Sequence, residues 1–415
     1  MIVRHALPAA ALVVVGVLST TIGPTSDIRV NDFFVYQTFA EGLRAGLFPY
    51  RDFPLEYPPL ALAPIWLASA FGSEPGRYAL VFGLEMLACG LAAQLIASKL
   101  AGSRATTVAW LLAFSPLVTG AMVRTHFDLL PVALTLGALL ALSRGRTTSG
   151  FVLLGVGAMT KLFPAILVPV AAAWLIGRGE RRQAAIGVAA FAATTIAISL
   201  PFLGDGYLDI ARFHAERPVQ IESTPASILF ALGDSEVTGA PARPDRFKSS
   251  GLDGGATSEL QWAFAALQLL ALAAVCAVAA RSQRAGEGEE VENDDASRPA
   301  TPLERQQLVL AAATALTAFV ALGKVLSPQF MIWLLPFGAL AWAYRERAAA
   351  LLIGAATGLT QLEFPARYFD LVGGDTPTIV LVAARNALLL AALTTLLWRV
   401  AAPARWRRRV AAASP

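Results

Sequence analysis

Residues 151–176 read FVLLGVGAMTKLFPAILVPVAAAWLI, and this stretch decides the fold class. Lys161 is its only charged residue, and its length falls between one membrane-spanning helix and two. A charge inside a span costs roughly 2.5–3.5 kcal/mol, so such a residue usually faces a cavity, a partner or a ligand. We therefore expect two short membrane-embedded helices that meet near Lys161 and Pro164, where irregular backbone survives only in a protein interior or beside a cavity.

A second lysine, Lys324, also interrupts the apolar sequence, at the end of a hydrophobic run. Lys324 ends the apolar run from 308 to 322, inside the sequence GKVLSPQF. The alternative to a functional role is snorkelling, in which a lysine near a helix end lifts its ammonium to the lipid headgroups. Both interpretations stay open for each lysine. The functional one is favoured if both lysines face the same side of the membrane as the other unusual residues.

The composition is that of a polytopic membrane protein. Of the 415 residues, 56% are hydrophobic and 15% are charged, and the mean hydropathy is +0.59, whereas soluble domains carry about 25% charged residues. The net charge of +4 comes from arginines at the ends of apolar runs, so no nucleic-acid partner is expected. Two cysteines within apolar runs exclude a disulfide framework and a cysteine-rich zinc site, and the three histidines are scattered. We expect no cofactor, while a carboxylate-bound divalent cation stays open.

Hydropathy predicts an all-α fold with about twelve transmembrane segments. The first is expected to be a retained helix rather than a cleaved signal peptide, because no small-x-small cleavage pattern follows it. Arginines cluster in alternate connections, and the positive-inside rule therefore places both termini in the cytoplasm. The expected spans are 6–23, 78–99, 105–121, 129–143, 149–160, 163–177, 183–203, 262–280, 307–322, 329–343, 348–361 and 377–400. The exterior connections are then 24–77, 122–128, 161–162, 204–261, 323–328 and 362–376.

The chain divides into a transmembrane module at 1–203, an exterior loop at 204–261 and a second transmembrane module at 262–415. Within the second module, the cytoplasmic loop 281–305 is acidic and lacks aromatic residues, which predicts disorder. Residues 234–255 are rich in Gly, Pro and Asp, which is typical of flexible surface. In the first exterior loop, residues 61–71 are apolar but short, so we predict an interfacial or re-entrant helix.

The first exterior loop supplies the principal catalytic candidate. Asp32 precedes Tyr36 and Ala40 at helical spacing, so it is either the cap of a short amphipathic helix or a general base held at the membrane surface. Asp27 is a nearby competitor for the role of base. The later sequence PLEYPP is rigid and aromatic, which suits a segment that positions the loop. The residues expected to position it are Tyr36, Glu56 and Tyr57.

Cations and carboxylates gather on the same predicted face of the membrane. Carboxylates among fixed cations suit transfer from a phosphate-activated donor, because cations stabilise the leaving phosphate and a carboxylate deprotonates the incoming hydroxyl. No glycine-rich nucleotide cradle is present in the sequence, so a lipid-linked phosphosugar fits better than a nucleotide. For Asp128, an ion pair with Arg124 at helical spacing is the structural alternative. The residues expected to bind the donor phosphate or sugar are Arg124, His126, Asp128, Lys161, Arg217, Glu222, Lys324 and Gln329.

Short motifs follow one another in a specific order. In the first loop they are Asp32-x-x-Val35-Tyr36, Gly46-x-x-Pro49-Tyr50-x-Asp52-Phe53 and Glu56-Tyr57-Pro58-Pro59-Leu60. Further along they are His126-Phe127-Asp128, Lys161-Leu162-Phe163-Pro164, Arg217-Pro218-x-Gln220-Ile221-Glu222-Ser223 and Lys324-x-x-Ser327-Pro328-Gln329. From about residue 27 to about residue 340, this ordered set resembles glycosyltransferase family 87, to which the phosphatidylinositol-mannoside mannosyltransferases of mycobacteria belong.

The resemblance implies a GT-C fold, with a shared helical module, interfacial helices in the first exterior loop and a variable C-terminal module. It also implies an inverting transfer from a polyprenyl-phosphate sugar, most often mannose, and it maps the family's essential aspartate onto Asp32. The sequence distinguishes mannose only weakly from arabinofuranose or glucose as the sugar that is transferred. The acceptor, a lipid or a glycan, stays open, because residues 234–255 and 281–305 depart from the family's pattern.

A non-catalytic carrier or flippase of lipid-linked sugars is the alternative, because it would also need interior charges and broken helices. A transporter should carry charges near mid-membrane and comparable broken helices in two repeated halves. Here the charges are predicted at one face and the halves differ. We therefore expect an enzyme of the cell membrane whose site faces the exterior and whose partners are the bilayer, the lipid-linked donor and the acceptor.

Overall fold

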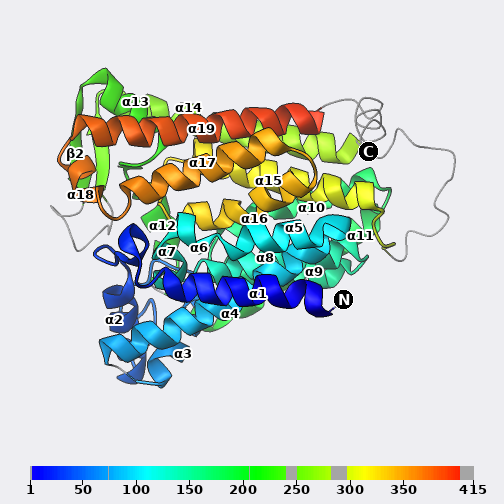
Figure 1. Ribbon diagram of the computed structural model, residues 1–415, viewed down its shortest axis with the longest axis horizontal. Coiled ribbons are helices and arrows are strands. Elements are labelled where there is room, and N and C mark those ends of the chain that lie inside the picture. The colour runs from blue at the N-terminus through cyan, green and yellow to red at the C-terminus, as the bar shows by residue number, and fades with distance from the viewer. Residues whose placement is uncertain (1, 73, 205, 240–249, 282–296, 402–415) are drawn as a thin grey trace.

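The computed structural model describes residues 2–72, 74–204, 206–239, 250–281 and 297–401. This part of the chain is largely helical, and its long helices lie side by side as a bundle (Figure 1). Several are long and apolar enough to cross a membrane, as expected of a multi-pass membrane protein. The segments of that length are Pro75–Thr119, Arg181–Phe202, Thr257–Arg281, Pro302–Leu322 and Thr376–Ala401.

A helix occupies every range in which hydropathy predicts a span, although several of these helices are shorter than a membrane crossing. The longer ones are α1 (Ile2–Leu18), α4 (Pro75–Ala101), α11 (Arg181–Ser199), α14 (Thr257–Arg281), α15 (Pro302–Leu322), α17 (Arg347–Glu363) and α19 (Thr376–Ala401). The shorter apolar ones are α5 (Ala105–Ala113), α8 (Leu129–Ser143), α9 (Thr147–Thr160), α10 (Leu167–Gly177) and α16 (Phe330–Ala343).

Proline decides where two of the apolar runs break. The range 105–121, expected as one helix, is divided into α5 and α6 (Pro116–Thr119), because Pro116 has no N–H and cannot continue α5. The expected break at Lys161 is present. There α9 ends, Lys161 is extended with φ −155° and ψ 135°, and the short helix η4 (Phe163–Ile166) begins with Pro164 in its first turn.

The connections at one end of the bundle carry most of the short elements, and we call this the α2 end (Figure 1). At the opposite end α1 begins and α19 ends. The elements of the α2 end are η1 (Gly23–Ser26), α2 (Phe33–Arg44), η2 (Pro59–Ala61), α3 (Leu62–Ala70), α7 (Met122–Thr125), α12 (Asp209–Glu216), α13 (Thr224–Leu232) and α18 (Tyr368–Val372).

The α2 end also holds a small three-stranded sheet, which the sequence did not predict within the mostly helical fold. Strands β1 (Val219–Gln220), β3 (Ser250–Gly254) and β2 (Ser235–Gly239) pair antiparallel in that order, with Val219 opposite Leu252. The sheet forms because apolar residues of β1 and β3 pack with α13 and α19 in one cluster. Residues 235–239 and 250–254 are therefore ordered strands rather than flexible surface. Residues 240–249, and the part of the predicted disordered loop from 282 to 296, lie outside the described residues.

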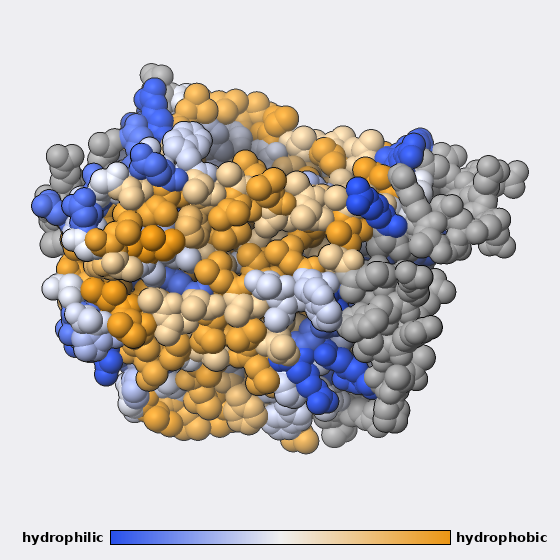
Figure 2. All heavy atoms as spheres, turned by 90° about the horizontal axis from the view of Figure 1, so that it is seen from above, coloured by the Kyte–Doolittle hydropathy of each residue, from blue (hydrophilic) through white to orange (hydrophobic). Residues whose placement is uncertain are grey.

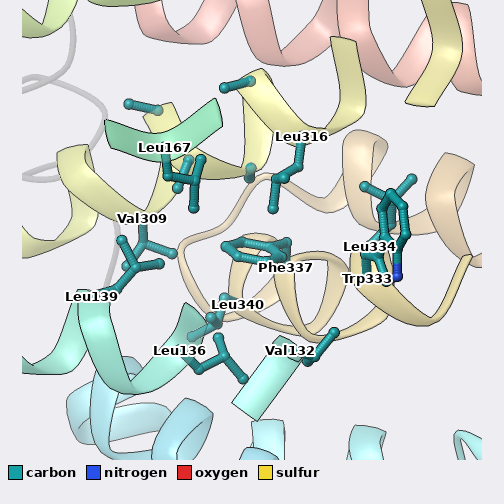
Figure 3. Packing of buried hydrophobic residues seen from close by; sticks show 14 of the residues in the cluster. Val132, Leu136, Leu139, Leu167, Val309, Leu316, Trp333, Leu334, Phe337 and Leu340 are labelled. Atoms are coloured by element: carbon teal, nitrogen blue, oxygen red, sulfur yellow. The ribbon is translucent and has the colours of Figure 1, made fainter. Parts of the chain in front are cut away.

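The main core lies between α8, α9, α10, α15 and α16. Figure 3 shows Phe337 surrounded by leucine and valine side chains of these helices, among them Leu136, Leu316 and Leu340. The face seen in Figure 2 is also largely apolar in its middle, while hydrophilic residues gather toward its two ends. Exposed apolar side chains on the long helices α4, α14 and α19 include Leu80, Leu269 and Val380, each at least 60% exposed. Such a belt is expected where lipid replaces water as the solvent.

Candidate active site at the α2 end

Asp32 immediately precedes α2 but does not cap it. Its side chain makes no hydrogen bond to the helix backbone, and Asn31 Oδ1 accepts the Phe33 N–H at 2.8 Å instead. The Asp32 carboxylate accepts a hydrogen bond from the Tyr36 hydroxyl at 3.1 Å and lies 3.6 Å from His126 Nε2. Burial and the neighbouring Asp32 raise the pKa of Tyr36, so this hydroxyl keeps the proton that it donates. The capping interpretation of Asp32 is wrong.

His126 is held by its other ring nitrogen. Its Nδ1 lies 3.0 Å from the Thr125 hydroxyl, which also bonds the Ala121 carbonyl at 3.0 Å. A hydroxyl carries one proton, so a Thr125 that donates to Ala121 accepts from Nδ1–H. Nε2 is then the ring atom that faces Asp32, where it can hold or pass a proton.

The other aspartates of the first loop are bound to arginines beside them. Asp27 accepts a 2.7 Å hydrogen bond from Arg29, and Asp52 accepts one of 2.9 Å from Arg51. Both arginines are solvent-exposed, so these are ordinary surface pairs. Asp32 faces a buried histidine instead, which distinguishes it chemically from both.

Asp128 is fully buried and holds Lys161. Lys161 Nζ donates to Asp128 Oδ1 at 2.7 Å, and Trp333 Nε1 donates to the same oxygen at 2.5 Å. The ammonium also lies 5.0 Å from the Phe127 ring centre and 5.6 Å from that of Trp333, within the range of cation–π attraction. The alternative pairing of Asp128 with Arg124 is therefore wrong, because the cation that Asp128 binds lies 33 residues along the chain. Lys161 does not snorkel, since its ammonium turns to a buried carboxylate.

The Phe127 ring contacts Tyr36, which binds Asp32, and also Lys161, which binds Asp128. Its centroid lies 5.6 Å from that of Tyr36 and 5.1 Å from that of Tyr57, while Lys161 lies over its face. Burial, together with charges that include Asp32 and Asp128, raises the pKa of Tyr57. We call the resulting group the aspartate cluster, and its members are Asp32, Tyr36, Tyr57, His126, Phe127, Asp128, Lys161 and Trp333.

Lys324 and Arg217 form a second group, which we call the cation pair. Lys324 Nζ donates to the carbonyls of Ala215 and Arg217 at 2.7 and 2.8 Å. Burial and the nearby Arg217 guanidinium lower the pKa of Lys324. Burial also lowers the pKa of Arg217, against the opposing charge of Glu56. Glu56 thus links the first loop to the cation pair, beside Tyr57 of the aspartate cluster.

Glu222 is turned into the protein, away from an open site. It is 1% exposed, and its carboxylate accepts from Gln220 Nε2 at 2.5 Å and interacts with the carboxyl of Glu363. Its backbone carbonyl accepts from Arg385 at 2.6 Å. Burial raises the pKa of Glu222 well above the ordinary range. Several atoms of this group, including both carboxyl oxygens of Glu363, have no hydrogen-bond partner within the described residues.

Two more predicted site residues have local structural partners. The Arg124 guanidinium donates to the carbonyls of Thr25 and Ser26 at 3.1 and 3.2 Å, which fastens η1 to α7. Gln329 accepts a 2.5 Å hydrogen bond from the Ser327 hydroxyl at the start of α16. Neither residue is part of the aspartate cluster.

Sequence reasoning missed three residues at this end. Trp333 follows the Lys324 motif and supplies the second donor to Asp128. Glu363 and Arg385 form the buried group with Glu222. A signal was present for Arg385, which is the one charged residue between positions 377 and 398 of an apolar run.

No group of three or more His, Cys, Asp or Glu side chains suited to a metal ion occurs in the described residues. The aspartate cluster is suited to proton transfer, because it combines a partly exposed carboxylate, a histidine and two tyrosine hydroxyls. The cation pair beside it suits an anion. Together they can deprotonate one group and bind the negative charge of another.

Comparison with known proteins gives one family. The model of glycosyltransferase family 87 matches residues 55–292, which is more than half of the 415-residue chain. No curated protein matches the chain.

Proposed function

The chain belongs to glycosyltransferase family 87, and from this premise we propose that it is an inverting enzyme acting on a polyprenyl-phosphate sugar. It transfers a hexose, which we propose to be mannose, to a lipid or glycan acceptor and forms an α-glycosidic bond. The GT-C fold, the twelve crossings and an active site on the exterior face of the cell membrane belong to the same proposal. The helices at every predicted span and the grouping of short elements at the α2 end support it.

The observation that carries the proposal is the environment of Asp32. Of the three aspartates in the first exterior loop, Asp27 and Asp52 are bound to exposed arginines, whereas Asp32 faces His126 and Tyr36. A general base needs an accessible lone pair, and the Asp32 side chain is 27% exposed.

In the proposed reaction, Asp32 removes the proton from the acceptor hydroxyl as its oxygen attacks the anomeric carbon. The bond from that carbon to the phosphate oxygen breaks, and polyprenyl phosphate leaves as a stable anion that needs no proton. Attack and departure occur on opposite faces of the sugar, so the configuration inverts. His126 Nε2, next to Asp32, can take the proton onward after transfer.

The cation pair is the proposed site of the donor phosphate. The partners of the Lys324 ammonium are neutral carbonyls, so its charge is not compensated by them. Lys161 also has N–H donors to offer, but its charge is already balanced by Asp128. We therefore assign the larger share of phosphate binding to Lys324 with Arg217, and the smaller share to Lys161.

Transfer is tested by incubating the purified protein and native membrane lipids with radiolabelled polyprenyl-phosphate mannose. The expected result is label in a new glycolipid or glycan. Redistribution of intact donor between leaflets, without a new product, would overturn the proposal in favour of a carrier. Parallel donors carrying glucose or arabinofuranose identify the sugar.

Orientation is tested by cysteine labelling in a variant that lacks Cys89 and Cys276. Ser258→Cys at the start of α14 and Ser149→Cys at the start of α9 are both exposed and lie at opposite ends of the bundle. An impermeant maleimide applied to intact cells should label Ser258→Cys alone. Labelling of Ser149→Cys alone would place the α2 end in the cytoplasm and remove the proposed exterior site.

A further inference from the structure

Gln220 holds the backbone of the loop that carries Lys324. Its N–H donates to the Lys324 carbonyl at 2.9 Å, and its side-chain Oε1 accepts the Leu326 N–H at 2.8 Å. Gln220 is 1% exposed, so water does not compete for either bond. The two bonds lie on either side of Val325, and together they fix the backbone directly after Lys324.

The Lys324 side chain binds the same segment of the chain. Its Nζ donates to the carbonyls of Ala215 and Arg217, at the end of α12. Residues 215–220 therefore hold both the backbone and the ammonium of Lys324. Catalytic and binding groups lose much of their effect when they are misplaced by about 1 Å, so a shift of this loop would weaken contact with a bound phosphate.

The Gln220 amide can hold the loop in only one orientation. Its Nε2 donates to Glu222 Oε2 at 2.5 Å, which leaves Oε1 for the Leu326 N–H. An amide has one accepting end and one donating end, so rotation by 180° would place Nε2 against the Leu326 N–H, donor against donor. Glu222 is therefore the group that sets the orientation of Gln220.

Helix α19 in turn holds Glu222. Arg385 and Asn386 both donate to the Glu222 carbonyl, at 2.6 and 3.2 Å, and both are 1% exposed. An arginine in an apolar span is costly and usually has a functional reason. Here its bond begins a chain of contacts that runs through Glu222 and Gln220 to Leu326.

We propose that Gln220 is a positioning residue for Lys324, and that Arg385 and Glu222 act through it. By this chain of contacts, α19 of the C-terminal module determines where the lysine of the cation pair lies. The inference rests on the proposed function for the role of Lys324 in binding phosphate. The hold of Gln220 on the loop can be measured without a substrate.

The first test is hydrogen exchange, read by mass spectrometry, in the purified full-length protein in lipid nanodiscs. Gln220→Met keeps the length of the side chain but can neither accept from Leu326 nor donate to Glu222. A peptide that contains Leu326 should exchange about tenfold faster in this variant, as expected for the loss of one buried hydrogen bond. Unchanged exchange of this peptide would overturn the inference.

The matched control for this exchange test is Gln94→Met. Gln94 is a buried glutamine of α4 that donates to the carbonyls of Pro8 and Ala109, so the variant also removes buried hydrogen bonds to backbone. It should leave the Leu326 peptide unchanged. Equal acceleration of that peptide in Gln94→Met and Gln220→Met would show a general loosening and overturn the specific role of Gln220.

A second variant tests whether the bridge needs a donor that faces Glu222. Gln220→Glu can form both bonds while its carboxyl is protonated, because one oxygen accepts from Leu326 and the hydroxyl donates to Glu222. The neighbouring carboxyls of Glu222 and Glu363 favour that protonated form. The charged and titratable groups that act on Glu222 in the described part of the chain are Arg217, Glu363, Tyr368 and Arg385.

Gln220→Glu should therefore protect Leu326 as wild type does at about pH 6, and the protection should decline as pH rises and the new carboxyl ionises. Each variant is compared with wild type at the same pH, because the intrinsic exchange rate itself changes with pH. Exchange as fast as in Gln220→Met at about pH 6 would contradict the proposed bridge.

A double-mutant cycle on donor affinity separates positioning from general stability. The Kd for polyprenyl phosphate is measured in wild type, Gln220→Met, Lys324→Gln and the double variant. If Gln220 acts through Lys324, Gln220→Met should raise the Kd about tenfold in the wild-type background and hardly at all in the Lys324→Gln background. Equal losses in both backgrounds would overturn the positioning role.

The same measurements separate this inference from the proposed function. If the wild-type protein binds no polyprenyl phosphate, yet Gln220→Met speeds exchange at Leu326 and Gln94→Met does not, the proposed donor site fails and the hold of Gln220 on the loop stands. If wild type binds the donor and transfers sugar while Gln220→Met keeps the wild-type Kd, the proposed function stands and the positioning role is overturned.

Discussion

Buried charges occur at both ends of the bundle, and they differ in what they bind. At the opposite end, Arg178 donates to Glu180 and Glu304 at 2.9 Å each and to the Arg298 carbonyl at 2.7 Å. Glu304 also closes the capping box that begins α15. There each of these charged groups meets an opposite charge, and the network joins α10 to α15.

At the α2 end the balance is incomplete. Lys324 is held by neutral carbonyls, Asp32 is partly exposed beside a histidine, and Asp128 Oδ2 has no hydrogen-bond partner in the described residues. Both ends contain charges in a largely apolar chain, but the Arg178 network is balanced by opposite charges, whereas these groups of the α2 end retain unused binding capacity. The difference separates charges that hold helices together from charges available to a substrate.

The largest expected effect is on turnover, from Asp32→Asn. This change keeps the shape of the side chain and removes its basicity, so turnover should fall about 10²–10⁴-fold. Steady-state transfer assays and a thermal melt on the same preparation check it. Asp27→Asn is the matched control and should retain activity, because Asp27 is bound to Arg29. Near-wild-type turnover in Asp32→Asn with an inactive Asp27→Asn would move the role of base to Asp27.

At the opposite end the expected effect is on stability alone. Arg178→Met removes the arginine that faces Glu180 and one of the two arginines that face Glu304, which keeps Arg298, and breaking a buried ion pair costs about 3–5 kcal/mol. Unfolding of the purified protein measures it, while kcat per folded molecule should not change. Arg212→Met, at an exposed pair of the α2 end, is the control and should cost less than about 1 kcal/mol. A lowered kcat in folded Arg178→Met would contradict the proposal that charges at this end stabilise the fold and take no part in substrate binding.

A smaller effect is expected on donor affinity, from Lys324→Gln. Loss of one charge-assisted contact of about 1.5–3 kcal/mol should raise the donor Kd about 10- to 100-fold. Equilibrium binding of polyprenyl phosphate to purified protein measures it. Lys99→Gln, an exposed lysine at the last turn of α4, is the control. Equal donor affinity in Lys324→Gln and wild type would leave the phosphate to Lys161.

The smallest expected effect is a pH dependence of stability at Glu222. Its folded-state pKa lies above the ordinary value of 4.5, so the stability from this group is complete below that pH and declines as pH rises through the folded pKa. Glu222→Gln cannot ionise and should therefore flatten that decline at pH values above 4.5. Melting curves across this range test it, with exposed Glu236→Gln as control. Parallel curves for wild type and Glu222→Gln would show that the buried group adds no pH dependence.

The helices were predictable because hydropathy is a local signal. The break at Lys161 was predictable as well, since a charge and a proline interrupt an apolar run at one place. The predicted ranges 129–143 and 377–400 lie within one residue of the ends of α8 and α19, which illustrates how closely hydropathy locates a helix. The division at Pro116 shows the limit, because residues 105–121 have the hydropathy of a single span.

The pairings at the α2 end were not predictable from local spacing. Asp128 finds its cation in Lys161, 33 positions away, and its second donor in Trp333, 205 positions away. Glu222 looked like a site carboxylate because its loop is polar, yet tertiary packing buries it beside Glu363. Such contacts depend on how the helices are arranged in space. Neither the period of the hydrophobic pattern nor the helix propensity of the residues carries that information.

The aspartate cluster and the cation pair are supported by separate hydrophobic clusters. Tyr36 and Phe127 belong to one with α3 and α4, whereas β1, next to Arg217, packs in another with α13 and α19. Mutations that repack one cluster are therefore expected to leave the packing of the other unchanged. Under the proposed division of roles, acceptor preference and donor preference would then diverge independently over evolutionary time, because the first loop and the 204–261 loop pack in different clusters.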